Sequence, residues 1–168
     1  RLAQTLKRDG LAAPSLGYVY ASSAMGPKSL LREIARALVC YSNGSAHQVL
    51  TNLIYTARRR NPRPALIIDE AQHLKGDLGM LEILRELGDR AGMGLVIAGH
   101  DNLEQMFDPD RSPLEQWVSR IDYRLRLPGL SEKEVREIAQ AELGQVSERS
   151  LAAILSQSEA FDRFARKK

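Results

Sequence analysis

Hydrophobic residues recur at helical spacing in two segments near the start of the chain. A short β-prone run at 18–20 comes first and is followed by small polar residues. Beyond it, apolar side chains three and four positions apart predict amphipathic helices over 28–40 and 45–60. Turn-forming residues at 42–44 separate the two helices. The second helix is predicted to end in three arginines, at 58–60, where cations suit the negative end of the helix dipole.

Two unbroken apolar runs follow, at 65–68 and 95–98. A run without alternation predicts a strand that is buried on both faces, as in a parallel sheet covered by helices. Helical spacing over 78–91 supplies the long connection that parallel strands require. Strands that alternate with helices therefore predict an α/β fold in which helices sandwich a parallel sheet.

The next segment combines short helices with a further β-prone stretch. A helical piece is predicted over 102–107, and a second one contains Trp117. Between 123 and 127, apolar and basic residues alternate, as they do along a half-buried strand. The alternation therefore predicts a fourth strand at 123–127.

Beyond residue 129 only helical patterns remain. The first helix is predicted to begin at Ser131, whose side chain can form a capping box with Glu134. A second helix is predicted to begin near Ser147. We therefore divide the chain into an α/β core over 1–129 and a partial, small helical lid over 130–168.

The composition fits this architecture and limits the choice of partners. The 168 residues are 43% hydrophobic and 27% charged, with a net charge of +3. This mild basicity permits a nucleic-acid partner but does not require one. The single cysteine, Cys40, excludes an internal disulfide, and no apolar stretch approaches the roughly 18 residues of a membrane span. We therefore expect a cytoplasmic protein that has no membrane partner.

The first candidate for chemistry is the end of the apolar run at 65–68, where Asp69 and Glu70 follow directly. In an open parallel sheet, ligands bind at the carboxyl ends of the strands. One carboxylate there can hold Mg²⁺ through its water shell, and the other can orient and polarise a water that attacks a γ-phosphate. The alternative is structural, because buried strands also end in acidic residues where they meet solvent.

Two further positions are candidates because of their places in the chain. His100 follows Gly99 at the end of the next apolar run, where a polar side chain can contact both the attacking water and the γ-phosphate. Arg120 precedes the predicted strand at 123–127, and an arginine that reaches a neighbouring subunit's nucleotide stabilises charge on the transferred phosphate. Each position has a structural alternative: an exposed histidine beside a helix cap, and a surface arginine in a weak ion pair.

A loop that grips phosphates is missing from the sequence. Such a loop reads G-x-x-x-x-G-K-[ST], and the nearest stretch to it is at 26–29. That stretch fails, because Pro27 removes a backbone N–H donor and Ala21 stands where the first glycine belongs. The order of the strands places the loop upstream of Arg1, before a helix that we expect over 1–9. We therefore interpret the chain as a fragment of a longer protein.

Several of these segments resemble those of a known family. The stretch at 68–74, which reads Ile-Asp-Glu-Ala-Gln-His-Leu, looks like the Walker B segment of bacterial AAA+ ATPases. The stretch at 99–103 resembles their sensor 1 segment, and 119–121 resembles their arginine-finger region. The residues at 18–20 and 26–30 are similar to those of the TniB/TnsC type of transposition ATPase, which is related to the phage Mu B protein and the ExeA-type ATPases.

The resemblance implies a P-loop NTPase-like (AAA+) fold that binds ATP and Mg²⁺ and hydrolyses ATP to ADP and phosphate. Asp69 would be the Mg²⁺-linked acid at the nucleotide, and Glu70 would be the catalytic base. His100 would take the sensor 1 place, where relatives carry Thr, Asn or Gln. Arg120 would be the finger that acts on the next subunit, and Arg163 would fall at the sensor 2 place beside the nucleotide. Because the Walker A loop is missing, we expect the 168 residues alone to be inactive.

The same resemblance implies the partners. In such relatives, ATP drives assembly into rings or filaments on double-stranded DNA, which then recruit a transposase or a target-selection protein. A segment after their second strand faces DNA, which points here to Ser22, Ser23 and Lys28. We therefore expect a bacterial, ATP-dependent, DNA-binding regulator of transposition that forms homo-oligomers. Two alternatives remain open: a non-hydrolysing scaffold or DNA-binding module without a P-loop, and an ExeA-like ATPase of a secretion or signalling system.

Overall fold

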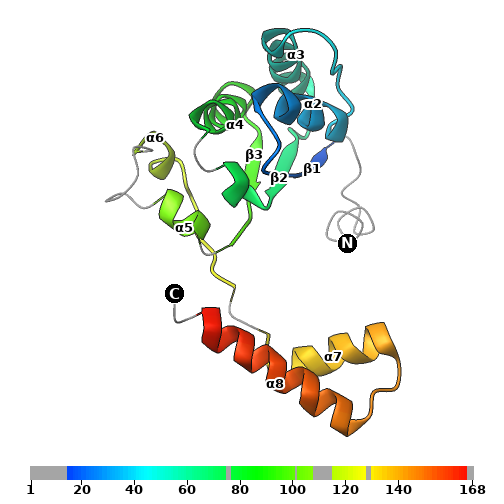
Figure 1. Cartoon of the computed structure of the whole chain (residues 1–168). Helices are drawn as coiled ribbons and strands as arrows, with labels where there is room; N and C mark the ends of the chain where they lie inside the picture. The colour runs from blue at the N-terminus through cyan, green and yellow to red at the C-terminus, as the bar shows by residue number, and fades with distance from the viewer. Residues whose placement is uncertain (1–14, 75–76, 101, 108–114, 128–129, 166–168) are drawn as a thin grey trace. The chain divides into compact units, whose positions relative to one another are not determined.

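The structure is a computed structural model that describes residues 15–74, 77–100, 102–107, 115–127 and 130–165 (Figure 1). The chain divides between Ile121 and Asp122 into two compact units. The sequence placed the boundary at residue 129, and the two domains assigned there remain a prediction. The helix predicted over 1–9 lies outside the described residues.

Three parallel strands form the sheet of the first unit, in the order β1, β2, β3. β1 spans Leu16–Tyr20, β2 spans Ala65–Asp69 and β3 spans Gly94–Ile97. In the central strand, Ile68 lies between Val19 of β1 and Ile97 of β3. Ile68 and Leu66 of this strand are fully buried, because β2 has a neighbour on each side. The predicted α/β class with a parallel sheet is therefore confirmed.

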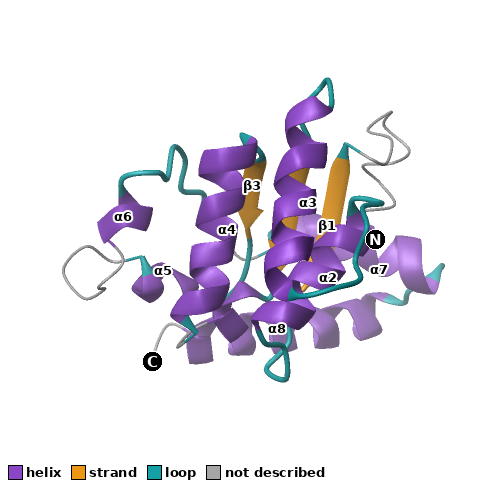
Figure 2. Cartoon of the chain, turned by 90° about the horizontal axis from the view of Figure 1, so that it is seen from above, coloured by secondary structure: helices purple, strands orange, loops and turns teal. Residues whose placement is uncertain are grey.

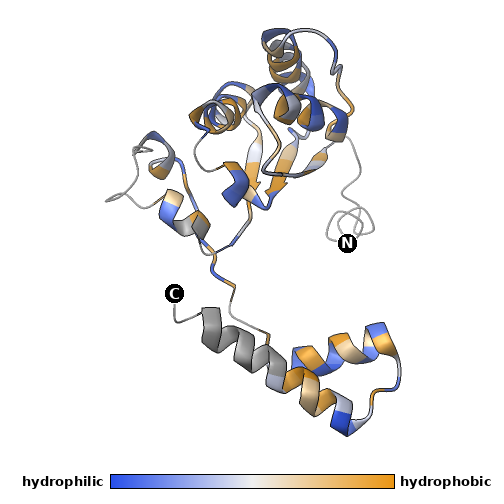
Figure 3. Cartoon of the chain, in the orientation of Figure 1, coloured by the Kyte–Doolittle hydropathy of each residue, from blue (hydrophilic) through white to orange (hydrophobic). Residues whose placement is uncertain are grey.

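Three helices form a layer over one face of the sheet (Figure 2). α2 spans Pro27–Ala37, α3 spans Ala46–Arg59 and α4 spans Leu78–Ala91. Figure 3 shows that each of these helices has a hydrophobic and a hydrophilic side, as the spacing of their apolar residues predicts. The hydrophobic sides share one core with alternate residues of the strands. Its fully or nearly buried aliphatic residues include Val19, Leu30, Leu31, Ile34, Val49, Leu53, Leu66, Ile68, Leu84 and Leu87.

Side-chain caps fix where two of these helices begin. The hydroxyl of Ser45 accepts a hydrogen bond from the Gln48 backbone N–H at 3.2 Å before α3. The carboxylate of Asp77 accepts one from the Met80 backbone N–H at 3.1 Å before α4. Each cap satisfies a backbone donor that has no partner inside the helix.

The helix predicted over 28–40 begins where it was expected but ends earlier. Pro27 is its first residue, a position that needs no N–H donor. Its last residue is Ala37, and Val39 then adopts a φ of 53°. A β-branched residue in this left-handed region cannot continue a right-handed helix. Cys40 therefore lies after the helix and is half-buried.

The strand predicted at 123–127 is wrong, because the structure has no strand there. The three apolar residues that suggested it are almost fully exposed: Tyr123 at 94%, Leu125 at 84% and Leu127 at 79%. A strand needs a neighbour for its backbone hydrogen bonds, and the sheet described above does not pair with this segment. The alternation indicated how side chains would divide between the two faces of a strand. It carried no information on whether a neighbouring strand is present to pair with.

Short helices complete the described part of the first unit. The 3₁₀ helix η1 spans Ala71–Leu74, α5 spans Asn102–Met106 and α6 spans Glu115–Val118. Trp117 anchors α6, since it is 6% exposed and belongs to the main core. Its ring lies 5.7 Å from the ring of Phe107, centre to centre, at a tilt of 50°. The residues that follow Trp117 are therefore tied to the body of the unit.

The second unit contains two helices that pack on each other. α7 spans Glu132–Leu143 and α8 spans Glu148–Ala165. The predicted capping box is confirmed, because Ser131 N–H donates to Glu134 Oε2 at 2.8 Å and Glu134 N–H donates to Ser131 Oγ at 3.3 Å. None of the helices in the described part of the chain is long and apolar enough to cross a membrane.

The central strand is expected to dominate the stability of the first unit. Replacing Ile68 with Ala should lower the free energy of unfolding by about 2–5 kcal/mol, because it opens a cavity in a fully buried strand. Replacing Val96 with Ala is the matched control, because this residue of β3 is 53% exposed and the change should cost less than about 1 kcal/mol. Denaturant titration measures both values, and equal losses would contradict the burial described here.

Candidate functional site

Backbone hydrogen bonds continue beyond the carboxyl ends of the strands and hold three loops side by side. The Ala21 N–H, just after β1, donates to the Asp69 carbonyl at 2.9 Å. On the other side of β2, the Ala71 N–H donates to the Ala98 carbonyl at 2.9 Å. The loops after β1, β2 and β3 therefore form one edge, at the place where parallel α/β sheets bind ligands.

The carboxylate of Asp69 is held in place by two donors at this edge. Its Oδ2 accepts a hydrogen bond from the Tyr18 hydroxyl at 2.7 Å, and its Oδ1 accepts one from the Glu70 backbone N–H at 2.9 Å. The bond to Asp69 is also the main reason that the pKa of Tyr18 rises from 10.0 to about 12. The side chain of Asp69 is therefore fixed by its neighbours, and lone pairs on both oxygens remain for other ligands.

Glu70 stands in a backbone conformation that few residues adopt. Its φ is 54°, in the left-handed region that costs a non-glycine residue about 1–3 kcal/mol. Its side chain is oriented by Gln72, whose Nε2 donates to Glu70 Oε2. Residues in such strained conformations concentrate at active sites and ligand clamps. The conformation of Glu70 is therefore what a reactive or ligand-binding carboxylate would show.

Gln72 joins this carboxylate to the loop after β3. Its Oε1 accepts a hydrogen bond from the His100 backbone N–H at 3.2 Å, while its Nε2 donates one to Glu70 Oε2. Gly99 makes the approach close, because a Cβ at this position would lie 2.5 Å from Gln72 Oε1 and 3.3 Å from the Ala71 nitrogen. The backbone at 99–100 is therefore beside Glu70, whereas the His100 side chain is exposed.

Comparison with known proteins identifies the family. The AAA domain family matches residues 1–107, which contain the whole of this edge. The chain belongs to the AAA domain family. The predicted P-loop NTPase-like (AAA+) fold is thereby confirmed, and no curated protein matches the chain.

A solved structure shows the same fold. It is the ORC2 protein of Aeropyrum pernix, described as ADPNP and ADP complexes, with 20% sequence identity and a TM-score of 0.58. The similarity covers 83% of the AAA chain and 38% of the archaeal one. The AAA chain thus spans well under half the length of that protein.

The acidic edge of the AAA chain fits Mg²⁺ that is held mainly by water and phosphate. Asp69 and Glu70 offer carboxylate oxygens, the ligands that this ion prefers. Within the described ranges, no group of three or more His, Cys, Asp or Glu side chains gathers to form a complete protein cage. Mg²⁺ at nucleotide sites is commonly bound by one or two carboxylates together with waters and phosphates. The donor set is therefore suitable, and these roles of Asp69 and Glu70 remain predictions.

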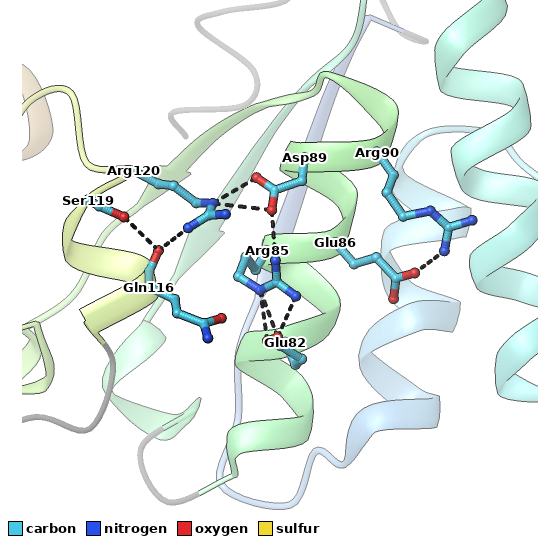
Figure 4. A network of polar contacts seen from close by, with 8 residues as sticks. All are labelled: Glu82, Arg85, Glu86, Asp89, Arg90, Gln116, Ser119 and Arg120. Carbon is cyan, nitrogen blue, oxygen red and sulfur yellow. Dashed lines mark hydrogen bonds and ion pairs between the residues drawn. The ribbon is translucent and has the colours of Figure 1, made fainter.

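Arg120 makes its contacts away from the acidic edge. Its Nε donates to both oxygens of Asp89 on α4, at 2.9 and 3.2 Å, and its Nη1 donates to the Gln116 carbonyl (Figure 4). The bond from Arg120 holds the pKa of the Asp89 carboxyl below its ordinary value. The described structure does not bring Arg120 to Asp69 or Glu70 of the same chain. Its predicted role toward another subunit stays a prediction.

The residues predicted to face DNA flank the same edge. Ser22 is half-buried, whereas Ser23 and Lys28 are exposed. Ser22 lines a hollow of about 370 Å³, together with Tyr18 and residues of α2. Arg163 lies within α8, and its side chain is outside the described residues.

Three residues that had no role assigned from the sequence pattern complete this picture. Tyr18 and Gln72 orient Asp69 and Glu70, and Asp89 holds Arg120. Gln72 had a signal in the sequence, since it stands two residues after Glu70 in the acidic segment. Tyr18 and Asp89 are 51 and 31 residues from their partners, so only the folded chain reveals them.

Replacing Gly99 with Ala is expected to displace the Gln72 side chain. The new Cβ would overlap Gln72 Oε1, so the bond to the His100 amide should be lost and hydrogen exchange at this amide should accelerate by about tenfold. Replacing Gly26 with Ala is the matched control, because a Cβ there has no neighbour within 4 Å. Unchanged exchange at His100 in the Gly99 variant, measured by NMR, would contradict this geometry.

Tyr18 is expected to ionise near pH 12, whereas an unperturbed tyrosine ionises at 10.0. The tyrosinate absorbance of the wild type minus that of a Tyr18→Phe variant isolates this group. Because the folded chain holds the proton more tightly, the bond contributes stability that is intact below about pH 10 and is lost as the pH rises to about 12. Asp69→Asn should return the midpoint toward 10, and a wild-type midpoint already there would show that the bond is absent.

Proposed function

We propose that the chain is the core of an ATP-dependent, DNA-binding regulator of transposition, which hydrolyses ATP to control its assembly on double-stranded DNA. The observation that carries the proposal is the pair Asp69 and Glu70 at the carboxyl end of the central strand of an AAA domain. The surroundings of the two carboxylates differ. Asp69 is fixed by two donors, while Glu70 has a strained backbone and an amide that orients its side chain. Such a difference suits two separate roles.

The two carboxylates divide the work of hydrolysis in this proposal. Asp69 holds Mg²⁺ through water, and Glu70 orients and polarises the attacking water. When bound, Mg²⁺ neutralises charge on the β- and γ-phosphates of ATP. Gln72 keeps the Glu70 carboxylate aimed and ties it to the loop that carries His100. The exposed imidazole of His100 then takes the sensor 1 place at the nucleotide.

Two arginines complete the proposed nucleotide site. Arg120 acts on the nucleotide of the next subunit in a ring or filament, where a guanidinium stabilises charge on the transferred phosphate. Its side chain is 42% exposed, which leaves it accessible to a neighbour. Arg163 of the helical lid acts at the sensor 2 place. Each site is therefore completed only when subunits of this protein assemble.

The loop after β1 is proposed to contact DNA through Ser22, Ser23 and Lys28. The Ala21 N–H bonds to the carbonyl of Asp69, so this loop is tied to the residue that is proposed to hold Mg²⁺. A change at the acidic edge can thereby reach the DNA contact directly. The assembled protein then recruits a transposase or a target-selection protein, in the bacterial cytoplasm.

A non-hydrolysing DNA-binding module is the second candidate, and the charge distribution favours it. The segment 34–68 has no Asp or Glu, yet it contains Arg36, Arg63 and the three arginines at 58–60. A basic segment of this kind suits a phosphate backbone. Salt-dependent DNA binding by the chain without nucleotide would support this candidate. ATP turnover without DNA affinity would instead favour an ExeA-like ATPase of secretion or signalling.

Replacing Glu70 with Gln in the full-length protein tests the main proposal. Turnover of ATP should fall by a factor of about 10²–10⁴, because the general base is removed. ATP-dependent binding to double-stranded DNA should persist, since Asp69 and the proposed DNA-contacting loop after β1 are unchanged. Glu86→Gln on the surface of α4 is the matched control and should leave both measurements unchanged. Unaltered turnover in the Glu70 variant would remove the catalytic assignment.

A further inference from the structure

A ladder of four alternating charges runs along the surface of α4 to Arg120 (Figure 4). Arg85 Nη2 lies 2.6 Å from Glu82 Oε1, and Arg85 Nη1 lies 2.7 Å from Asp89 Oδ2. Arg120 Nε then lies 2.9 Å from Asp89 Oδ1. The first three residues are three and four positions apart, so they share one face of the helix. Arg120 is the only member of the ladder that comes from outside α4.

Exposure to water limits what these ion pairs contribute to stability. The side chains of the ladder are between 24% and 52% exposed, and exposed ion pairs add little to stability because water screens them. The geometric effect of the ladder is larger, because each carboxylate holds a guanidinium in a defined orientation. Arg85 in turn keeps the Asp89 carboxylate in place for Arg120. The ladder therefore orders a side chain more than it stabilises the fold.

Within the described residues, hydrogen bonds to three residues hold Arg120, and one end of its guanidinium takes no part in them. Its backbone N–H donates to the Trp117 carbonyl at 2.9 Å, and Trp117 is buried in the core. Its Nε bonds to Asp89, and its Nη1 bonds to the Gln116 carbonyl. A guanidinium has five N–H donors, and the Nη2 group makes no hydrogen bond to any residue that the structure describes. The bonds from Nε and Nη1 thus leave the Nη2 end of the guanidinium available for an anionic ligand.

We propose that Asp89 is the positioning residue for Arg120, holding its guanidinium by Nε so that the Nη2 end is presented to a phosphate of the neighbouring subunit's nucleotide. The inference rests on the proposed function of Arg120 as a finger. Asp89 does not contact that nucleotide and acts through Arg120 alone. The alternative is that the pair only ties α6 to α4.

The position of Arg120 is tested directly by NMR of its side-chain Nε–Hε group in the 168-residue chain. Replacing Asp89 with Ala should accelerate hydrogen exchange at this Hε by about tenfold and broaden the range of side-chain orientations. Glu86→Ala is the matched control, because it removes another carboxylate of α4, which pairs with Arg90. Slow exchange that survives in the Asp89 variant would overturn the proposal.

The effect of Asp89 on ATP turnover in a neighbouring subunit is tested by mixing subunits of the full-length protein. Arg120→Ala lacks the finger but keeps Glu70, so mixing it with Glu70→Gln subunits, which keep the finger, should restore part of the turnover. Asp89→Ala should behave in the same way: at least tenfold slower alone, restored by Glu70→Gln subunits, and with an unchanged unfolding midpoint. The Glu86→Ala variant should match the wild type throughout.

Each result separates the inference from the function on which it rests. Full turnover by Arg120→Ala would overturn the finger assignment, while the Nε–Hε measurement still decides whether Asp89 holds Arg120. Loss of turnover by Arg120→Ala with full turnover by Asp89→Ala would overturn the positioning role alone. An Asp89→Ala protein that Glu70→Gln subunits fail to restore would also overturn it, because the defect would then lie in its own site.

Discussion

The hydrogen bonds that join β2 to both of its neighbours are the constraint on which the rest of the structure depends. They bury Leu66 and Ile68 completely and bring the loops after all three strands to one edge. The bonds of Ala21 to Asp69 and of Ala71 to Ala98 extend this pairing past the last strand residues. Glu70 can keep its strained backbone only because the residues on both sides of it are tied to neighbouring loops.

The sequence predicted the acidic edge because the relevant signals are local. An unbroken apolar run predicts a strand of a parallel sheet, and polar residues that follow the strand directly are expected at the edge of that sheet. The contacts that orient these residues are not local. Tyr18 reaches Asp69 because β1 and β2 pair in a particular register, and Gln72 reaches His100 because Gly99 leaves room. No periodicity in the chain encodes either relation.

The failed strand prediction at 123–127 has the same origin. Alternation describes how side chains divide between two faces, and Tyr123, Leu125 and Leu127 satisfy that pattern. A strand also needs a partner, and pairing is decided by what the rest of the chain presents. At 65–68 the partners exist on both sides, and the prediction was confirmed. The difference between the two outcomes lies in their neighbours and not in the segments themselves.

α4 gives the two halves of the proposed mechanism a common support. Its start follows η1, where Gln72 orients Glu70, and its second half carries Asp89, which holds Arg120. This helix of 14 residues is about 21 Å long, and it both contacts η1 and carries Asp89. In the proposed function, Glu70 acts on the nucleotide of its own subunit and Arg120 acts on that of the next. The same helix, α4, would then influence the positions of both side chains. A shift of α4 would then act on two nucleotide sites together, which would make assembly and hydrolysis depend on each other.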